Sequence, residues 1–136
     1  MKEEKHQAVL DEVLEEIETA VKDSRGLTAH QRRLAFVLSL GATTLIELYF
    51  HKLRIIKEGA KIDHLWLKKK KDSVKELLQK QIVSPISTVE GIDLILDLAM
   101  KIEEKRNDLA YGALAEDKVL QQKINLFFQL KESVKC

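Results

Sequence analysis

The sequence has one cysteine, one proline and five glycines among 136 residues, and only 5% of its residues are aromatic. Because the single cysteine is Cys136, at the last position, we expect no internal disulfide and no thiolate metal cluster. A reducing environment suits such a chain, and we predict a cytoplasmic protein. The scarcity of proline and glycine also disfavours the turns of a sheet and favours helices.

A dominant charge of one sign is absent as well. The 23 basic and 22 acidic residues give a net charge of +1, so no field of the whole molecule attracts nucleic acid, and RNA would have to bind to a local patch. A chain of 136 residues is long enough to bury about 68% of the surface of its unfolded form. We therefore treat residues 1–136 as one domain.

Long hydrophobic runs are also missing. The longest apolar stretch, residues 34–50, is interrupted by Ser39, Gly41, Thr43, Thr44 and Glu47. It is too short and too polar for a membrane span, and it predicts a buried central helix instead. The first six residues carry charges of both signs with no apolar segment directly after them, so they do not resemble a secretory signal. We expect no membrane association.

Apolar residues recur at spacings of three and four, with charged residues between them, along most of the chain. The segments cover residues 2–24, 28–58, 63–82, 89–106 and 117–134. This pattern predicts an all-α protein, an up-and-down bundle of about five helices. The expected helix boundaries are capping boxes at Thr28–Gln31 and Ser87–Glu90, a helix start at Asp63, and ends or bends at Gly26, Gly59 and Gly112.

Four polar residues spaced three or four apart interrupt the second predicted helix: Thr44, Glu47, His51 and Arg54, here called the polar seam. One interpretation is structural, a contact between helices in which Glu47 and His51 pair at i,i+4. The other is functional, with the polar seam as the wall of a site opposite Arg106. A carboxylate in so apolar a segment needs a cationic partner, for which Arg106 and Arg54 are candidates.

The third predicted helix carries four consecutive lysines, residues 68–71, followed by Lys75 and Lys80. Consecutive residues spread over all faces of a helix, so the structural interpretation is a solvated surface. The functional interpretation is a contact with a phosphate backbone, which would be salt-sensitive and independent of sequence. Under it, Lys68 and Lys69 are RNA-binding candidates.

The candidate site is the stretch from Lys105 to Gly112, where a polar cluster, an aromatic hydroxyl and a glycine lie between two apolar helical patterns. Arg106 offers a forked cation that suits a phosphate, and Asn107 offers both a donor and an acceptor. In the structural alternative, Arg106 pairs with Glu103 on the helix surface and Tyr111 packs.

Arg106 and Asn107, followed after three residues by Tyr111 and flanked by the apolar segments 94–99 and 116–120, resemble the signature region of the HEPN superfamily. The resemblance covers residues 77–134. Members are small all-helical proteins, and many are metal-independent ribonucleases or toxins paired with a minimal nucleotidyltransferase. The ribonucleases dimerise so that the motifs of two subunits face each other. The resemblance therefore implies a HEPN-like fold, a homodimer, RNA as a ligand and a nucleotidyltransferase antitoxin as a partner.

By the same resemblance, the catalytic positions are Arg106, Asn107 and Tyr111, with Arg106 on the phosphate and Asn107 as an orienting group. Tyr111 stands where the family has histidine. Tyrosine, whose side chain ordinarily has a pKa of about 10, can stack on a base or donate a hydrogen bond. It cannot accept the proton of a ribose hydroxyl near neutral pH as histidine does, with an ordinary pKa of about 6.5. We therefore expect ribonuclease activity to be weak or lost.

Other positions bear on the same question. Ala113 stands where the toxins that are modified by their partner carry a tyrosine. The resemblance therefore does not extend to regulation by nucleotidylation of that tyrosine. His51 and His64 are candidates for the missing base across a dimer, although no spacing supports either. Since Glu3-x-x-His6 has no second copy, we expect no di-iron site, no other metal and no cofactor. The alternative function is a non-enzymatic helical-bundle interaction protein.

Overall fold

The computed structural model describes residues 2–135, so Met1 and Cys136 lie outside the description. Six α-helices form in this range: α1 (Glu3–Lys22), α2 (Gln31–Lys52), α3 (Lys71–Gln79), α4 (Ile92–Glu103), α5 (Arg106–Tyr111) and α6 (Asp117–Ser133). Three 3-10 helices connect them, η1 (Leu27–His30), η2 (His64–Lys68) and η3 (Ile86–Thr88). Within residues 2–135 the β structure is limited to one bridge between Ile56 and Ile82. The predicted all-α class is confirmed.

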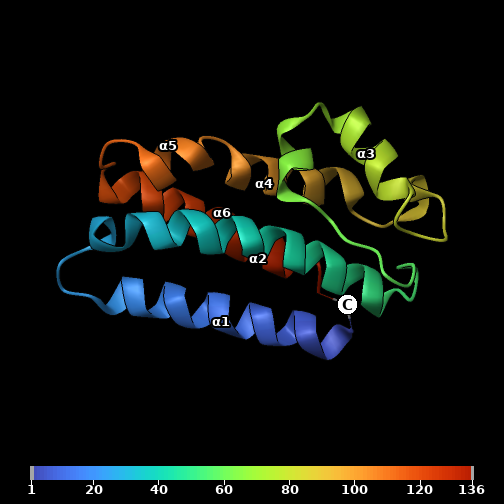
Figure 1. Cartoon of the computed structure of the whole chain (residues 1–136), viewed down its shortest axis with the longest axis horizontal. Coiled ribbons are helices and arrows are strands. Elements are labelled where there is room, and N and C mark those ends of the chain that lie inside the picture. The colour runs from blue at the N-terminus through green and yellow to red at the C-terminus, as the bar shows by residue number, and fades with distance from the viewer. Residues whose placement is uncertain (1, 136) are drawn as a thin grey trace.

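Helix α2 is the central element of the bundle. Figure 1 shows it between α1 on one side and the layer of α4, α5 and α6 on the other. Neighbouring long helices run in opposite directions, α1 against α2 and α4 against α6, so α1 begins and α6 ends at the same end of the molecule. The helix α3 lies beside α4, together with η2.

The burial of α2 follows from its sequence. Every residue from Gly41 to Phe50 is buried, as expected for a segment that is apolar on nearly all sides. Gly41 allows the closest approach: a Cβ atom there would lie 2.5 Å from Cε1 of Phe127 and 2.9 Å from Cγ1 of Val13. A larger residue at this position would therefore push α1 and α6 away from α2.

By length and composition, the segment Leu27–Lys52 could also cross a membrane, with a mean hydropathy of 1.5 over its most apolar window. A core helix passes the same test, and 78% of that window is buried inside the fold. The buried residues of α2 belong to the same apolar cluster as those of α1, α4 and α6.

The second helix ends earlier than predicted, at Lys52 and not near Glu58. Arg54 adopts a left-handed conformation with φ of 59°, and the amide of Ile55 donates to the Phe50 carbonyl at 3.1 Å. This pattern closes a helix. No local signal marks this end, because a left-handed end usually shows itself by glycine, and the next glycine, Gly59, lies further on.

The third predicted helix, residues 63–82, is divided in two. Asp63 does cap a helix start, since the amide of Leu65 donates to its Oδ1 at 2.9 Å, but the capped helix is η2. The chain is extended at Lys69 and Lys70 before α3 begins. The lysine run therefore spans a break between two elements.

Neither predicted capping box forms. The Thr28 hydroxyl donates to Oδ1 of Asp117 at 2.6 Å, and the Gln31 side chain bonds to the segment before α6. In the second case α4 begins only at Ile92, after the left-handed Gly91. Partners from distant parts of the chain displaced the local ones in the first case, and they fasten η1 and α2 to the α5–α6 connection.

Candidate functional site

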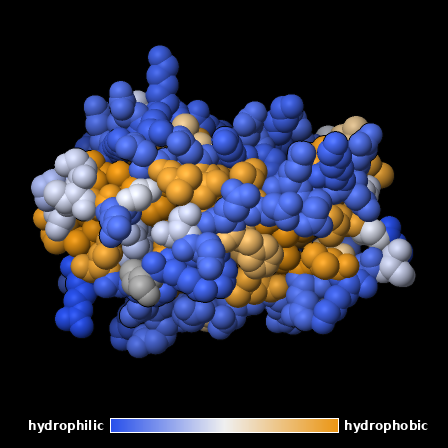
Figure 2. Space-filling model, turned by 180° about the vertical axis from the view of Figure 1, so that it is seen from behind, coloured by the Kyte–Doolittle hydropathy of each residue, from blue (hydrophilic) through white to orange (hydrophobic). Residues whose placement is uncertain are grey.

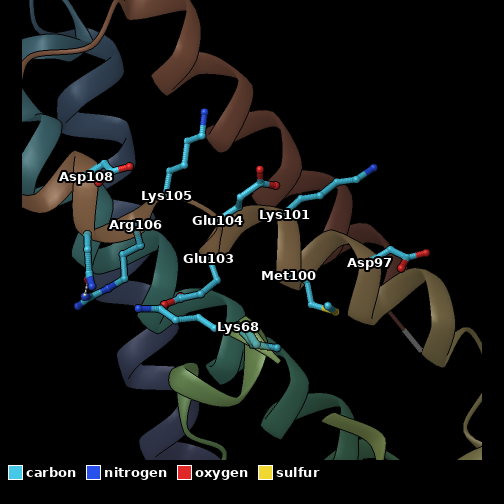
Figure 3. Close-up of a pocket in the computed structure, with 11 residues that line it drawn as sticks. Lys68, Asp97, Met100, Lys101, Glu103, Glu104, Lys105, Arg106 and Asp108 are labelled. Carbon is cyan, nitrogen blue, oxygen red and sulfur yellow. Dashed lines mark hydrogen bonds between the residues drawn. The ribbon is translucent and has the colours of Figure 1, made fainter. Parts of the chain in front are cut away.

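A cleft of about 610 Å³ lies between η2, the end of α4 and the start of α5. Its lining mixes four basic and four acidic side chains, Lys68, Lys101, Lys105 and Arg106 with Asp97, Glu103, Glu104 and Asp108. Figure 3 shows that Lys68, Glu103 and Arg106 point toward the same part of this cleft, whereas Glu104 and Lys105 point away from it. We call it the Arg106 cleft.

The backbone turn that places Arg106 lies before this residue. Helix α4 ends at Glu103, Lys105 is left-handed with φ of 60°, and α5 begins at Arg106. Lys123 from α6 holds the turn, because its Nζ donates to the carbonyls of Lys101 at 2.5 Å and Glu104 at 2.6 Å, which α4 leaves without helical partners. The bend therefore lies at residues 104–105, not at the predicted Gly112, which ends α5.

The guanidinium of Arg106 lies over the ring of Phe36, with Cζ 4.8 Å from the ring centroid. Its Nη1 donates to Oδ1 of Asn107 at 3.0 Å. Tyr111 meets the same ring edge to face, at 5.9 Å between centroids, and Phe36 and Tyr111 both stay exposed. We call Phe36, Arg106, Asn107 and Tyr111 the Arg106 stack. It brings Arg106 and Tyr111 together on one aromatic ring that sequence analysis had missed, with Asn107 hydrogen-bonded to Arg106.

Arg106 has no carboxylate partner among residues 2–135, and its buried Nε has no hydrogen-bond partner there. The pair with Glu103, which the structural alternative predicted, is not formed, because Glu103 bonds to other residues. The cation is thus held in place by Asn107 and Phe36 without an ion pair. Such a group is suited to an anionic ligand.

Two side chains at the start of α2 fix α5 in position. Gln31 Nε2 donates to the carbonyls of Leu109 and Ala113, each at 3.0 Å, and Gln31 Oε1 accepts from the amide of Ala115 at 2.7 Å. Arg32 Nη1 donates to the Ala110 carbonyl at 2.9 Å. These bonds satisfy backbone groups that the short helix leaves open. They hold the Arg106 stack against α2.

A second group of polar residues borders the cleft. The carboxylate of Glu103, 1% exposed, accepts from the Ser39 hydroxyl at 2.6 Å and from Nδ1 of His64 at 2.8 Å. Each of the three comes from a different element, α4, α2 and η2. Sequence analysis missed this group, although one signal was present: Glu103 follows the buried Leu96 and Ala99 at helical spacing, which puts its carboxylate on the buried face of α4.

The polar seam does not form a wall of the Arg106 cleft. Glu47 accepts from Nδ1 of His6 at 2.9 Å and from the amide of Ile62 at 3.1 Å, so the predicted Glu47–His51 pair is wrong. His51 contacts the ring of His6 instead, with centroids 4.9 Å apart, and Arg54 lies beyond the end of α2. Glu47 is about 16 Å further along α2 than Phe36, at 1.5 Å per residue.

Burial and the neighbouring His51 lower the pKa of His6 from 6.5 to about 4, so the ring is neutral near pH 7. Burial raises the pKa of Glu47. The sequence hid this pair, because His6 lies in the first turns of α1 and has no partner within the local pattern. Its partner comes from a helix that the chain reaches only after η1.

The lysines of the run have different surroundings. Lys68 lines the Arg106 cleft, whereas Lys69 lines a separate depression with α3. Lys71 pairs with Asp97 at 2.6 Å, and Lys75 pairs with Asp93 at 2.6 Å, so these two fasten α3 to α4. Of the two lysines predicted to contact RNA, only Lys68 lies in the same cleft as Arg106.

No group of three or more His, Cys, Asp or Glu side chains in residues 2–135 is arranged to hold a metal ion. Comparisons of the chain with protein-family models, with curated proteins and with solved structures found no match. Function is therefore inferred from the geometry of the chain itself.

Proposed function

We propose that the protein is a divergent HEPN-like protein that binds single-stranded RNA in the Arg106 cleft. The observation that carries this proposal is the state of Arg106, a cation that is oriented by Asn107 and Phe36 and forms no ion pair among residues 2–135. An arginine fork of this kind suits a phosphate oxygen pair. Lys68, on the opposite side of the cleft, supplies a second phosphate contact.

The aromatic rings favour a single strand over a duplex. Phe36 and Tyr111 are 41% and 72% exposed, directly beside the guanidinium. Unstacked bases bind to exposed aromatic rings, at about 1–3 kcal/mol per base, whereas the bases of a duplex are not accessible to them. In this proposal Tyr111 stacks on a base and Arg106 holds the neighbouring phosphate.

Binding of a labelled single-stranded oligoribonucleotide, followed by fluorescence anisotropy at several salt concentrations, tests the proposal. We expect Arg106→Ala to raise the Kd about tenfold and to lower the slope of log K against log salt by about 0.7, the value for one phosphate contact on a single strand. Lys68→Ala should lower the slope similarly, and Lys69→Ala should not.

Arg33→Ala is the matched control, since it removes the same charge from an exposed arginine of α2 that pairs with Glu16 at 3.6 Å. If Arg33→Ala and Arg106→Ala lose the same RNA affinity, the loss reflects only the removal of a positive charge, and the proposal is contradicted. Absence of binding by the unmodified chain would overturn it outright.

The alternative, an interaction protein without enzymatic activity, is favoured by apolar surface elsewhere. Leu94 and Phe128 are 55% and 44% exposed and line a shallow groove between α4 and α6. Figure 2 shows apolar surface between hydrophilic regions on the face opposite to that of Figure 1.

If this alternative holds, the double variant Leu94→Ser, Phe128→Ser loses self-association in sedimentation experiments, and Arg106→Ala leaves RNA affinity unchanged. The homodimer and the nucleotidyltransferase antitoxin stay predictions.

A further inference from the structure

A second cavity, of about 360 Å³, lies between the first half of α1, the middle of α2 and the segment 59–62 beyond the end of α2. Four polar side chains line it together with apolar ones: His6, Thr43, Thr44 and Glu47. We call it the Glu47 cavity. It shares no lining residue with the Arg106 cleft, so a ligand bound here is independent of the proposed RNA site.

The polar side chains of the Glu47 cavity already use the protons that they can donate. The hydroxyls of Thr43 and Thr44 both donate to the Leu40 carbonyl, at 3.0 and 2.8 Å. His6 donates the proton of Nδ1 to Oε2 of Glu47 at 2.9 Å. Because a neutral imidazole has a single N–H group, Nε2 of His6 is then an acceptor.

The backbone amides of the segment beyond α2 are engaged as well. Those of residues 60, 61 and 62 donate to the Lys57 carbonyl, Oε1 of Gln81 and Oε1 of Glu47, each at 3.1 Å. Lys61 is exposed, and its ammonium group forms no ion pair with Glu47. Apart from that ammonium group, these residues leave a ligand no free donor.

The unused groups are acceptors, and one of them carries a negative charge. Each oxygen of Glu47 keeps a lone pair beyond the one bond that it accepts, and Nε2 of His6 is buried without a hydrogen-bond partner among residues 2–135. His6 is neutral near pH 7, because burial and the neighbouring His51 lower its pKa to about 4. The buried Glu47 therefore has no cation paired with it, and burial raises its pKa.

The apolar part of the lining includes Val9, Leu40 and Ile62. Ligand sites in proteins have volumes of about 300–1,000 Å³, so this cavity suits a small molecule. An ammonium group has three donors, no acceptor and a charge opposite to that of a carboxylate. A compound that joins an ammonium group to an apolar body therefore matches both the polar and the apolar part of the lining.

We propose that the Glu47 cavity binds a small primary ammonium compound. The ammonium group donates to Glu47 and to the hydroxyl oxygen of Thr44, and the apolar body lies against Val9 and Leu40. The ligand supplies the cation that the buried carboxylate lacks, which is the reason for its selectivity over neutral molecules of the same shape. This function goes beyond RNA binding and does not rest on it.

The test uses the full chain and two probes of nearly the same shape, 2-phenylethylammonium and the neutral 2-phenylethanol. Isothermal titration calorimetry should show saturable binding of the ammonium probe to one site. We expect the alcohol to bind at least about tenfold more weakly, because hydrogen bonds between charged groups contribute at least that factor. The ammonium probe should shift the NMR signals of the Thr44 and Ile62 amides and leave that of Asn107 in place.

Three variants assign the binding to the cavity. Glu47→Gln keeps the size of the side chain but removes its charge, and it should weaken binding of the ammonium probe at least about tenfold. Thr44→Val has nearly the same shape without the acceptor and should weaken it about threefold. Glu103→Gln is the matched control, since Glu103 is also buried and also bonded to a histidine, His64 at 2.8 Å, and should bind with unchanged affinity.

The proposal is overturned if the unmodified chain shows no saturable binding, if both probes bind equally well, or if Glu47→Gln keeps the unmodified affinity. Circular dichroism shows whether Glu47→Gln is folded. If it is not, Thr44→Val decides, and an unchanged affinity in that variant overturns the proposal. Selective loss of the ammonium probe in folded Glu47→Gln, with Glu103→Gln unaffected, supports it. RNA binding by the Arg106 cleft stands or falls by its own experiment.

Discussion

Two histidine–glutamate pairs occupy different regions of the molecule, and they differ in one property. His6 pairs with Glu47 at 2.9 Å between α1 and α2, and His64 pairs with Glu103 at 2.8 Å between η2 and α4. In both, Nδ1 meets the carboxylate. The His6 side chain is 2% exposed, and that of His64 is 33% exposed. We call them the closed pair and the open pair.

The difference shows that the pair itself does not define a reactive site. The Nε2 atom of His6 is buried without a hydrogen-bond partner among residues 2–135, and burial keeps the ring neutral. The Nε2 atom of His64 is not enclosed in this way. Exposure of the second nitrogen therefore distinguishes a pair enclosed in the fold from one that partly faces solvent.

Removing the carboxylate of the closed pair should have the largest effect on stability. Glu47→Ala leaves Nδ1 of His6 and the amide of Ile62 without an acceptor in the interior. At about 1–3 kcal/mol for each of the two unsatisfied donors, we expect a loss of about 2–6 kcal/mol in the free energy of unfolding. Urea denaturation measures it, with Glu47→Gln as the milder control. A loss below about 1 kcal/mol would mean that this region is hydrated and not closed.

The closed pair should also make stability depend on pH. The pKa of His6 is lowered to about 4 in the folded state from 6.5, so between these values the unfolded chain binds the extra proton. Stability then falls as the pH falls from about 6.5 to 4, by up to about 3 kcal/mol from this residue. The raised pKa of Glu47 acts in the opposite direction, because between the ordinary and the raised pKa the folded state binds the extra proton, and this makes the slope less steep.

Thermal unfolding between pH 4 and pH 7 measures how the stability of the protein depends on pH. His6→Gln should remove most of it, and His64→Asn, in the open pair, should leave it in place. An identical pH profile for His6→Gln and the unmodified chain would assign the dependence to other groups.

Changing the histidine of the open pair should have the smallest effect on stability. In His64→Asn the amide keeps the hydrogen bond to Glu103, and the lost ring atoms were partly exposed. We expect a change of less than about 1 kcal/mol in the free energy of unfolding, as for substitutions that leave no buried group unsatisfied. A loss as large as that of Glu47→Ala would erase the contrast between the pairs and make the open pair structural as well.

The sequence predicted which segments are helical better than it predicted the residues at which the helices end. The apolar spacing of α1, α4 and α6 indicated these helices and their buried faces, because the period of 3.6 residues is visible within a few turns. The ends at Arg54 and Lys105 were not predicted, since both are left-handed positions occupied by residues other than glycine. Surrounding contacts impose these conformations, and no local signal records them.

The candidate site was predictable only in part. The sequence indicated Arg106, Asn107 and Tyr111 together, because they are neighbours on one stretch. It did not indicate Phe36 or Ser39, which belong to another helix. It also suggested Glu47 and His51 as a pair because they are neighbours on a helix, whereas the actual partner of Glu47 comes from α1.

The sequence by itself determined the all-α class, the amphipathic segments and the polar stretch at residues 105–112, because periodicity and composition are local properties of a chain. Only the tertiary structure decided which polar groups meet. The bonds of Thr28 to Asp117, of Gln31 to Leu109 and of Ser39 to Glu103 join residues 89, 78 and 64 positions apart. Partners at such separations are chosen by the packing of helices, and burial then decides which histidine is closed and which is open.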